Sequence, residues 1–302
     1  MRLPTRSPRR LTPESDTPKE APKVTQEPQP DQRPIPPAVQ KAYGAADLGA
    51  NPLFAGGFIN FGHWQAIDTT AGLSQEDRVR SQQDMYRHVL EALPPAGGSR
   101  ALEVGSGTGV GSALALEEYG FAHLTGMDIH PQQLIRAQEC NSRILKDRPD
   151  HLDFVQGAAE DMPFADGEFD YLYSVEAAQH FSDLDAFGRE TARVLRPGGH
   201  AVVASFFTTD DAPGRAKRLA GLLDCYANGL DIAHPVTHVV DALARAGLKG
   251  TRAVSIGPSV WQGWDRWIAH VSEPDGWPRN FLRVHEEGVL DYYVVTATRP
   301  AP

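Results

Sequence analysis

Three glycines at alternate positions follow an apolar segment in the run ALEVGSGTGVG, which spans residues 101–111. Because Gly105, Gly107 and Gly109 lack Cβ, the backbone there can turn sharply and bring its N–H groups against a ligand. Asp128 closes the next apolar run, where a carboxylate can accept hydrogen bonds from both hydroxyls of a ribose. This combination predicts a site for a nucleoside-containing cofactor.

The spacing of the glycines bears on which cofactor that is. The dinucleotide-binding pattern G-x-G-x-x-G/A requires glycine or alanine at its last position. A match starting at Gly105 meets Val110 there, and one starting at Gly107 meets Ser112. The spacing therefore disfavours the alternative of an NAD(P)-dependent oxidoreductase.

The G-x-G-x-G pattern resembles motif I of the class I methyltransferases that use S-adenosylmethionine (SAM). The resemblance implies that the methionine end of SAM is held by Glu103 and the glycine loop, made of Gly105, Ser106, Gly107 and Gly109. It also implies that Asp128, with Ile129 beside it, binds the ribose.

The run GAAEDMPF, residues 157–164, resembles the adenine-side loop of the same family. Many members carry aspartate directly after the glycine, whereas this sequence has Ala158. A side-chain contact to the adenine amino group must then come from Glu160 or Asp161, and the resemblance assigns Ala159 and Glu160 to the cofactor site.

The run GGFINFGHW, residues 56–64, resembles the N-terminal lid motif of natural-product methyltransferases, especially macrolide-sugar O-methyltransferases of the erythromycin-pathway type. The runs SVEAAQHF, WDRW and LDYYVVTATRP resemble their counterparts in that subgroup. The resemblance implies antibiotic or other natural-product biosynthesis. We expect His63 and Trp64 to close over SAM and the acceptor, and Gln82 either to approach the methionine carboxylate or to be solvated.

A hydroxyl acceptor must lose its proton during methylation, and a positioned base contributes on the order of 10²- to 10⁴-fold to such a step. His180 follows the fourth predicted strand, and related O-methyltransferases place a catalytic histidine in this loop. The alternative is a histidine that only bonds to backbone or packs against SAM. Because Asp210 and Asp211 come late for the supporting aspartate of some relatives, either the base acts alone or an acid of the lid reaches it.

Glu176 offers a different reaction, because a buried carboxylate can stabilise or deprotonate the carbocation formed when an alkene carbon is methylated. Sterol and prenyl C-methyltransferases use glutamate in a comparable loop. Glu176 can instead orient His180 or accept from a backbone N–H. A third alternative is a SAM-fold protein that transfers no methyl group and acts as a cyclase or a binding module.

Aromatic residues gather in the expected lid segments and near the late part of the chain. Some will pack in the core, but an acceptor site is usually apolar. We expect a bulky, largely apolar small-molecule acceptor, with a pocket lined by Phe58, Phe61, Phe206, Phe207, Tyr226, Trp261 and Trp264.

Composition excludes several other classes. The net charge of -10 over 302 residues argues against a nucleic-acid partner. Cys140 and Cys225 lack the spacing of a zinc site or a disulfide framework, and no metal is expected to be required. No apolar run is long enough to span a bilayer and no secretory signal is seen, so we expect a cytoplasmic protein. Its oligomeric state is left open, with a homo-oligomer possible.

Helical and strand patterns alternate along most of the chain, which predicts an α/β, Rossmann-like sheet, mostly parallel, covered by helices on both faces. The resemblance implies an antiparallel final strand. A Pro-rich disordered tail is expected at 1–37 and the methyltransferase domain at 38–302, with lid segments at about 52–72 and 207–234. The expected helices are 74–93, 110–119, 131–145, 184–194 and 236–246, and the expected strands are 100–104, 123–128, 152–156, 169–174, 200–206, 251–256 and 290–298.

Overall fold

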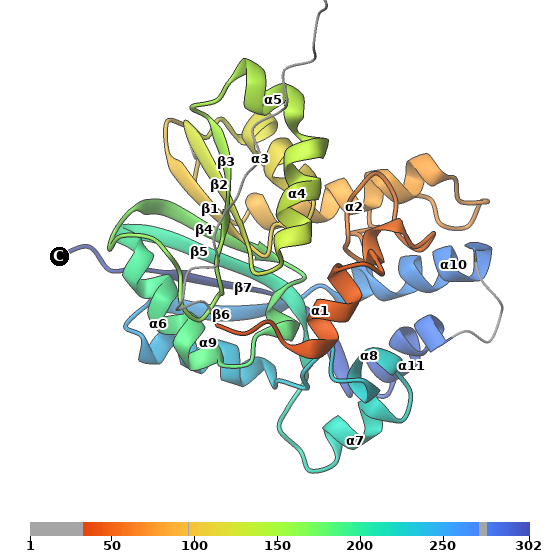
Figure 1. Cartoon of the computed structure of the whole chain (residues 1–302). Helices are drawn as coiled ribbons and strands as arrows, with labels where there is room; N and C mark the ends of the chain where they lie inside the picture. The colour runs from red at the N-terminus through yellow and green to blue at the C-terminus, as the bar shows by residue number, and fades with distance from the viewer. Residues whose placement is uncertain (1–32, 96, 272–276) are drawn as a thin grey trace, which may run out of the picture. The chain divides into compact units, whose positions relative to one another are not determined.

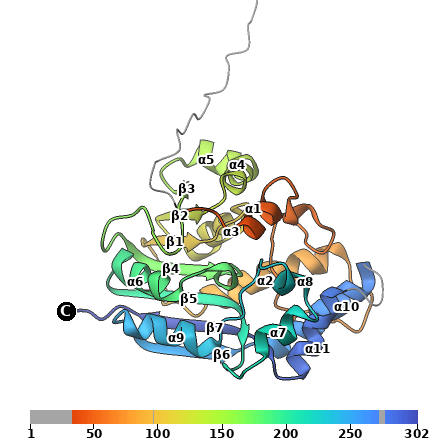
Figure 2. The ribbon, with the colours of Figure 1, turned by 60° about the horizontal axis from the view of Figure 1, so that its bottom comes forward.

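The computed structural model describes residues 33–95, 97–271 and 277–302. Their strands form one sheet in the order β3-β2-β1-β4-β5-β7-β6, which can be followed in Figures 1 and 2. Strands β1 to β5 are parallel, whereas β7 is antiparallel to both β5 and β6. The expected sheet with an antiparallel final strand is confirmed. The strands are β1 (Arg100–Val104), β2 (His123–Asp128), β3 (Leu152–Gln156), β4 (Phe169–Val175), β5 (Leu195–Thr208), β6 (Lys249–Ser255) and β7 (Leu290–Thr298).

Helices connect and flank these strands. The helices are α1 (Pro37–Tyr43), α2 (Gln75–Leu90), α3 (Val110–Tyr119), α4 (Pro131–Cys140), α5 (Ser142–Asp147), α6 (Leu184–Val194), α7 (Arg215–Ala220), α8 (Asp224–Ala227), α9 (Val236–Arg245), α10 (Trp261–Val271) and α11 (Asn280–Glu286). Single 3₁₀ turns lie at η1 (Leu48–Ala50), η2 (Ala178–His180), η3 (Gly257–Ser259) and η4 (Trp277–Arg279). No helix in the described ranges is long and apolar enough to cross a membrane.

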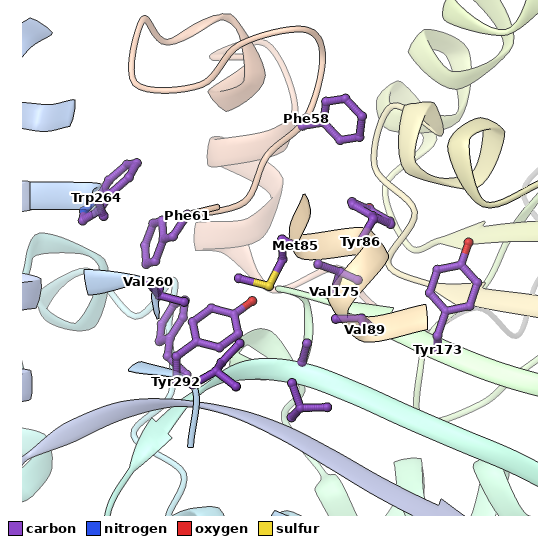
Figure 3. Close-up of a cluster of buried hydrophobic side chains, with 14 of the residues drawn as sticks. Phe58, Phe61, Met85, Tyr86, Val89, Tyr173, Val175, Val260, Trp264 and Tyr292 are labelled. Carbon is purple, nitrogen blue, oxygen red and sulfur yellow. The ribbon is translucent and has the colours of Figure 1, made fainter. Parts of the chain in front are cut away.

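A hydrophobic cluster packs on each face of the sheet, and successive side chains of a strand enter the two clusters in turn. On β4, Tyr173 and Val175 belong to the cluster that packs against α2, α3, α10 and α11. Leu172, directly before Tyr173, belongs to the cluster that packs against α6 and α9. Figure 3 shows the first cluster, where Met85 and Val89 of α2 lie against side chains of the sheet. Helices on two faces leave the strand ends as the place where loops can form a site.

The beginning of α2 follows from its sequence. Ser74 precedes the helix, and its Oγ accepts a hydrogen bond from the Asp77 backbone N–H at 3.1 Å. Asp77 in turn accepts from the Ser74 backbone N–H at 2.9 Å, which completes a capping box. The predicted start is confirmed, while the helix ends at Leu90 rather than Leu93.

Two predicted elements differ from the structure. The helix expected over 131–145 is interrupted at Asn141, whose side-chain amide donates to the carbonyls of Ala137 and Thr108 at 2.8 and 3.2 Å. These bonds end α4 and tie it to the glycine loop. Strand β5 begins at Leu195 rather than His200, because Leu195 pairs with Phe169 of β4 and the Pro-Gly-Gly segment exchanges backbone hydrogen bonds with Arg299.

The segment Arg33–Tyr43 differs from the expectation for the tail. Residues 1–32 of that expectation lie outside the described residues, but Arg33, Pro34 and Pro36 lead directly into α1 and line a cavity of the protein. Helix α1 packs beside α4, because Arg136 donates hydrogen bonds to the carbonyls of Tyr43 and Gly44 at 2.7 and 2.8 Å. The N-terminal part of the described chain is therefore a wall of the cavity.

Candidate active site

A cavity lies beyond the ends of β1, β2 and β4, with α1 as one wall. Such a position is where open parallel sheets bind ligands. The predicted site residues that line it are Phe58, Gly105, Ser106, Gly107, Asp128, Ile129, Ala159, Glu160, Glu176 and His180. Lining residues that sequence analysis did not select include Arg33, Val39, Tyr43, Gly57, Ile59, Gln133 and Ser182.

The glycine loop leaves β1 through left-handed backbone. Gly105 has φ 79°, and a Cβ there would overlap the Cβ of Ala177. Gly107 has φ 53° and faces the cavity. Gly109 (φ 70°) does not line the cavity: it precedes α3, and a Cβ there would overlap the ring of Phe154. Its role is close packing, whereas Gly105 and Gly107 shape the wall.

Asp128 joins the two loops that form the floor of the cavity. Its carboxylate accepts from the Gly107 N–H at 2.9 Å and from the His130 N–H at 2.8 Å. Burial raises the pKa of Asp128, and the two backbone N–H groups oppose that shift. These two bonds leave the carboxylate fixed at the end of β2, where it can accept further hydrogen bonds from a ligand.

Glu103, which the resemblance assigns to the methionine end of SAM, is not among the residues that line the cavity. It is fully buried and accepts hydrogen bonds from the hydroxyls of Tyr86, Ser112 and Tyr173. Burial raises its pKa to about 7, although these three hydrogen bonds lower it. Glu103 thus links β1 to α2, α3 and β4.

Gln82 also lies outside the cavity lining. Its amide accepts from the Ala55 N–H at 3.1 Å and donates to the Phe58 carbonyl at 2.7 Å. Both ends of the side chain are occupied by the segment that carries Gly57 and Phe58 into the cavity wall. Gln82 therefore positions that segment instead of being solvated or facing the cavity.

His63 and Trp64 do not line the cavity either. The His63 ring stacks on His88 with centroids 4.4 Å apart, and burial lowers its pKa to about 4. Trp64 donates to the Phe61 carbonyl at 2.9 Å and lies under the Arg78 guanidinium, 5.6 Å from the ring centroid. Both residues fix the lid segment to α2 because they pack inward.

Six of the seven aromatic residues expected in the acceptor pocket pack elsewhere, and Phe58 alone among them lines the cavity. Phe61 contacts Phe206 and Trp264 with ring centroids 5.3 and 4.4 Å apart. Trp261 belongs to the same cluster, as does Tyr226, while Phe207 is buried on the other face of the sheet. Five of these six residues therefore pack in one cluster and Phe207 packs in the other, as expected for core side chains.

His180 lines the cavity on η2 and has a partner at each ring nitrogen. Its Nδ1 lies 2.9 Å from the Leu230 carbonyl and 3.1 Å from Asp231 Oδ1. Since both neighbours only accept, Nδ1 carries the proton and Nε2 presents its lone pair. The Tyr43 hydroxyl lies 2.8 Å from Nε2 and the Gln179 amide nitrogen 3.2 Å, and both are donors.

Asp231 was not identified from the sequence. It comes from the 207–234 segment and is buried, with its backbone N–H bonded to the Cys225 carbonyl at 3.0 Å. The neighbouring Ile232 N–H donates to the Gln179 carbonyl at 2.9 Å, which fastens the segment to η2. An acid of that segment therefore reaches the histidine, although it is neither Asp210 nor Asp211.

Glu176 lies at the end of β4 in left-handed backbone, with φ 50°. Its Oε1 accepts from the Phe61 N–H at 2.6 Å and from the Tyr292 hydroxyl at 3.1 Å. Burial raises its pKa to about 8, so the carboxyl group is mostly protonated at neutral pH. The expected contact with a backbone N–H is present, and the side chain also reaches the cavity.

The charges around the cavity suit SAM. The acidic residues Asp128 and Glu160 line it, and Arg33 is the single Lys or Arg side chain among the described lining residues. Acidic groups attract a ligand that carries a sulfonium and an ammonium group. Ser106 Oγ is buried and lacks a partner within the described ranges, so it is free to bond to a ligand. The residues present thus fit SAM, which Asp128, Ser106 and Gly107 would hold.

Comparison with known proteins agrees with this fold and site. Residues 102–203 match the family model described as a methyltransferase domain. The chain is 41% identical over 168 residues to 2-methyl-6-phytyl-1,4-hydroquinone methyltransferase of Synechocystis, covering 54% of this chain and 49% of that protein. It is 27% identical to erythromycin 3''-O-methyltransferase of Saccharopolyspora erythraea, covering 72% and 71% of the two chains.

A solved structure has the same fold. Geranyl diphosphate C-methyltransferase from Streptomyces coelicolor A3(2), in complex with Mg²⁺, geranyl diphosphate and S-adenosylhomocysteine, superposes with a TM-score of 0.65 at 19% identity. The superposition covers 74% of this chain and 81% of that one. The fold, the glycine loop and the match over residues 102–203 all resemble those of class I, SAM-dependent methyltransferases. Within that class, the relatives differ in acceptor, and the chain spans about half the length of the Synechocystis protein.

Proposed function

We propose that the protein transfers the methyl group of SAM to a hydroxyl of a bulky, largely apolar small molecule, with His180 as the general base. SAM, when bound, supplies an electrophilic methyl group on sulfur. The proposal rests mainly on the pair formed by His180 and Asp231, in which His180 lines the same cavity as Asp128 and the glycine loop while Asp231 contacts its Nδ1 from behind the lining. An aspartate at Nδ1 holds the imidazole in one tautomer and stabilises the cation that forms when Nε2 takes a proton.

The acceptor class follows from the remaining cavity wall. Val39, Phe58, Ile59 and Val110 present apolar surface next to the polar groups that face SAM. This mixture suits an apolar scaffold bearing one reactive hydroxyl. The similarity to the erythromycin enzyme supports an acceptor from specialised metabolism, such as a glycosylated macrolide.

A second candidate reaction is C-methylation at an alkene carbon, with Glu176 as the base. It is favoured by one observation, namely that the Glu176 carboxyl group faces the cavity while buried among Phe61, Tyr292 and the end of β4. The fold similarity to a prenyl C-methyltransferase is compatible with this candidate. Burial, however, raises the pKa of Glu176, which favours the protonated form of the carboxyl group over the form that accepts a proton.

The test is to incubate the purified full chain with methyl-labelled SAM and a panel of defined acceptors. The panel contains a macrolide with a free sugar hydroxyl, a phytyl hydroquinone, geraniol and geranyl diphosphate, the last with and without Mg²⁺. Mass spectrometry and NMR then assign the labelled atom. A methyl ether supports the proposed O-methylation. A new C–CH₃ bond supports the alternative, C-methylation with Glu176 as the base. Labelling of geranyl diphosphate alone contradicts the proposed acceptor class, as does the absence of any labelled product despite measured SAM binding.

The two candidate bases are separated by matched variants on the acceptor that is labelled. His180→Asn removes the proposed base, and Glu176→Gln keeps the shape of the alternative one. If the O-methyl product is lost only in His180→Asn, the proposed assignment is supported. Loss only in Glu176→Gln contradicts it. Because no metal is proposed to take part, we expect the activity to persist in about 5 mM EDTA, a large excess over the protein.

A further inference from the structure

We propose that Tyr43 is a catalytic residue, which passes the acceptor's hydroxyl proton to His180. The inference rests on the proposed O-methylation and deepens it, because it assigns the group that contacts the acceptor. Tyr43 lies in α1, in the part of the chain that precedes the family match at 102–203. Three observations carry it: the position of its hydroxyl, the tautomer of His180, and the way α1 is anchored.

The Tyr43 hydroxyl contacts the lone pair of His180 in the wall of the cavity. Its oxygen is 2.8 Å from Nε2, and the two rings meet edge to face with centroids 5.5 Å apart. Tyr43 lines the cavity together with Asp128 and Glu176. With Nδ1 committed to Leu230 and Asp231, Nε2 is the nitrogen that can accept a proton, and the phenol already donates to it.

Helix α1 holds Tyr43 in that position. Arg136 binds the Tyr43 and Gly44 carbonyls at 2.7 and 2.8 Å and lies 3.4 Å from the Asp47 carboxylate. Val39, one turn earlier, is buried and lines the same cavity. A side chain anchored in this way stays in place when an acceptor binds, so the acceptor hydroxyl meets the phenol before it meets the imidazole.

The chemistry of the phenol suits a relay. Burial, assisted by the nearby acids Asp231, Asp128 and Glu176, raises the pKa of Tyr43 well above its ordinary value. The phenol therefore stays protonated and does not hold a negative charge, although it can receive one proton while it gives up another.

The step balances as follows. The acceptor O–H proton moves to the Tyr43 oxygen as the Tyr43 proton moves to His180 Nε2. The freed electron pair of the acceptor oxygen forms the C–O bond to the methyl group, and the C–S bond breaks to leave S-adenosylhomocysteine. The imidazolium is stabilised by Asp231 and later returns its proton to water.

The geometry is tested first, without an acceptor, on the full chain saturated with S-adenosylhomocysteine. Histidine is labelled with ¹⁵N, and the Nε2 resonance of His180 is compared in wild type, Tyr43→Phe and Tyr119→Phe. Tyr119 is the matched control, because it also donates one phenolic hydrogen bond, to the Arg87 carbonyl at 3.1 Å, and lies outside the cavity lining. A shift of Nε2 only in Tyr43→Phe is expected. An unchanged resonance contradicts the contact and overturns the proposal.

The relay itself is tested by steady-state kinetics on a hydroxyl acceptor labelled in the panel above, with SAM affinity measured by calorimetry. Tyr43→Phe should lower kcat by at least about 10-fold, within the range that proton transfer contributes, while the Kd for SAM and the midpoint of thermal unfolding stay near wild type. Tyr119→Phe should match wild type in kcat. Unchanged or higher kcat in Tyr43→Phe overturns the relay, and so does a loss accompanied by weaker SAM binding or lower stability.

His180→Asn distinguishes failure of the relay from failure of the proposed function. If His180→Asn is inactive while Tyr43→Phe is fully active, the histidine is the base and accepts the proton directly. If His180→Asn is fully active, His180 is not the base, and the relay through Tyr43 is contradicted as well. Loss of turnover in both variants, with SAM affinity retained, is the expected pattern.

Discussion

Asp231 Oδ1 lies 3.1 Å from Nδ1 of His180, although β5 separates the two residues in the chain. The contact is held by backbone, because Ile232 N–H bonds to the Gln179 carbonyl at 2.9 Å. Ser205 of β5 adds a further link, since its hydroxyl donates to the Gln179 side chain at 2.6 Å. Strand β5, which lies between His180 and Asp231 in the sequence, thus also helps to hold the two residues together.

Replacing the members of this pair should separate catalysis from cofactor binding. His180→Asn should lower kcat by about 10²- to 10⁴-fold, because the proton of the acceptor then has no base. Asp231→Asn should have a smaller effect, since the Leu230 carbonyl still accepts from Nδ1. Single-turnover rates and calorimetric SAM affinities provide the measurement. Loss of SAM affinity parallel to the loss of turnover contradicts the assignment.

Asp128→Ala should weaken SAM binding, because the carboxylate that would accept from the ribose hydroxyls is removed and Gly107 N–H loses its partner. Two charge-assisted hydrogen bonds of about 1.5 kcal/mol each correspond to a Kd increase on the order of 100-fold. Asp153→Ala is the control, since Asp153 lies on the adjacent β3 and its side chain is 48% exposed. The SAM affinities are measured by calorimetry. If Asp128→Ala and the control bind SAM equally well, the predicted contact between Asp128 and the ribose is contradicted.

Glu176→Gln should change the dependence of stability on pH. The pKa of Glu176 is about 8 in the folded protein against an ordinary 4.5, so the folded chain holds a proton that the unfolded chain releases in this window. Its contribution is fully present below pH 4.5 and is lost as pH rises toward 8.

The variant lacks this titration. Between pH 5 and 8 the free energy of unfolding of wild type should therefore fall relative to that of the variant, by on the order of a few kcal/mol. Above pH 8 the difference between the two proteins should stay constant. Urea unfolding at several pH values measures it. A constant difference across the window contradicts the raised pKa, and loss of O-methylation in this variant contradicts the assignment of the base to His180.

Gly105→Ala should cost more stability than Gly120→Ala. Both glycines have left-handed backbone, with φ 79° and 71°, so the strain of a side chain there is shared. A Cβ at Gly105 would overlap Ala177, whereas a Cβ at Gly120 would meet open space. We expect an extra loss of about 1–3 kcal/mol for Gly105→Ala, together with weaker SAM binding. Denaturant titrations that give equal losses for the two variants rule out crowding at the glycine loop.

The local patterns of the sequence predict most of the sheet and the cofactor half of the site. Asp128 and Gly107 follow apolar runs directly, so their place at the strand ends depends on few residues. Glu103 shows the limit of that inference: a residue one position before the strand end points into the core, where it meets Tyr86 and Tyr173. Alternation along the strand decides which side a side chain takes, and a motif alone does not.

The acceptor half depends on contacts between distant segments, which local patterns do not carry. Asp231 lies in NGLDIAHP, which has no feature that points to His180. Tyr43 had a usable signal, because Pro37 begins a helix and Val39 and Tyr43 lie one turn apart on it. The proline-rich sequence before it predicts disorder and obscured that short helix.

Part of the proposed acceptor half is encoded outside the stretch that carries the cofactor half. The cofactor half lies within residues 102–203, the range that matches the methyltransferase domain. Tyr43, Ile59 and Asp231 lie on either side of that range. Recombination or laboratory exchange of the flanking stretches can therefore recast the preference for an acceptor while the cofactor half is inherited unchanged, so new members of such a lineage can arise without rebuilding their chemistry.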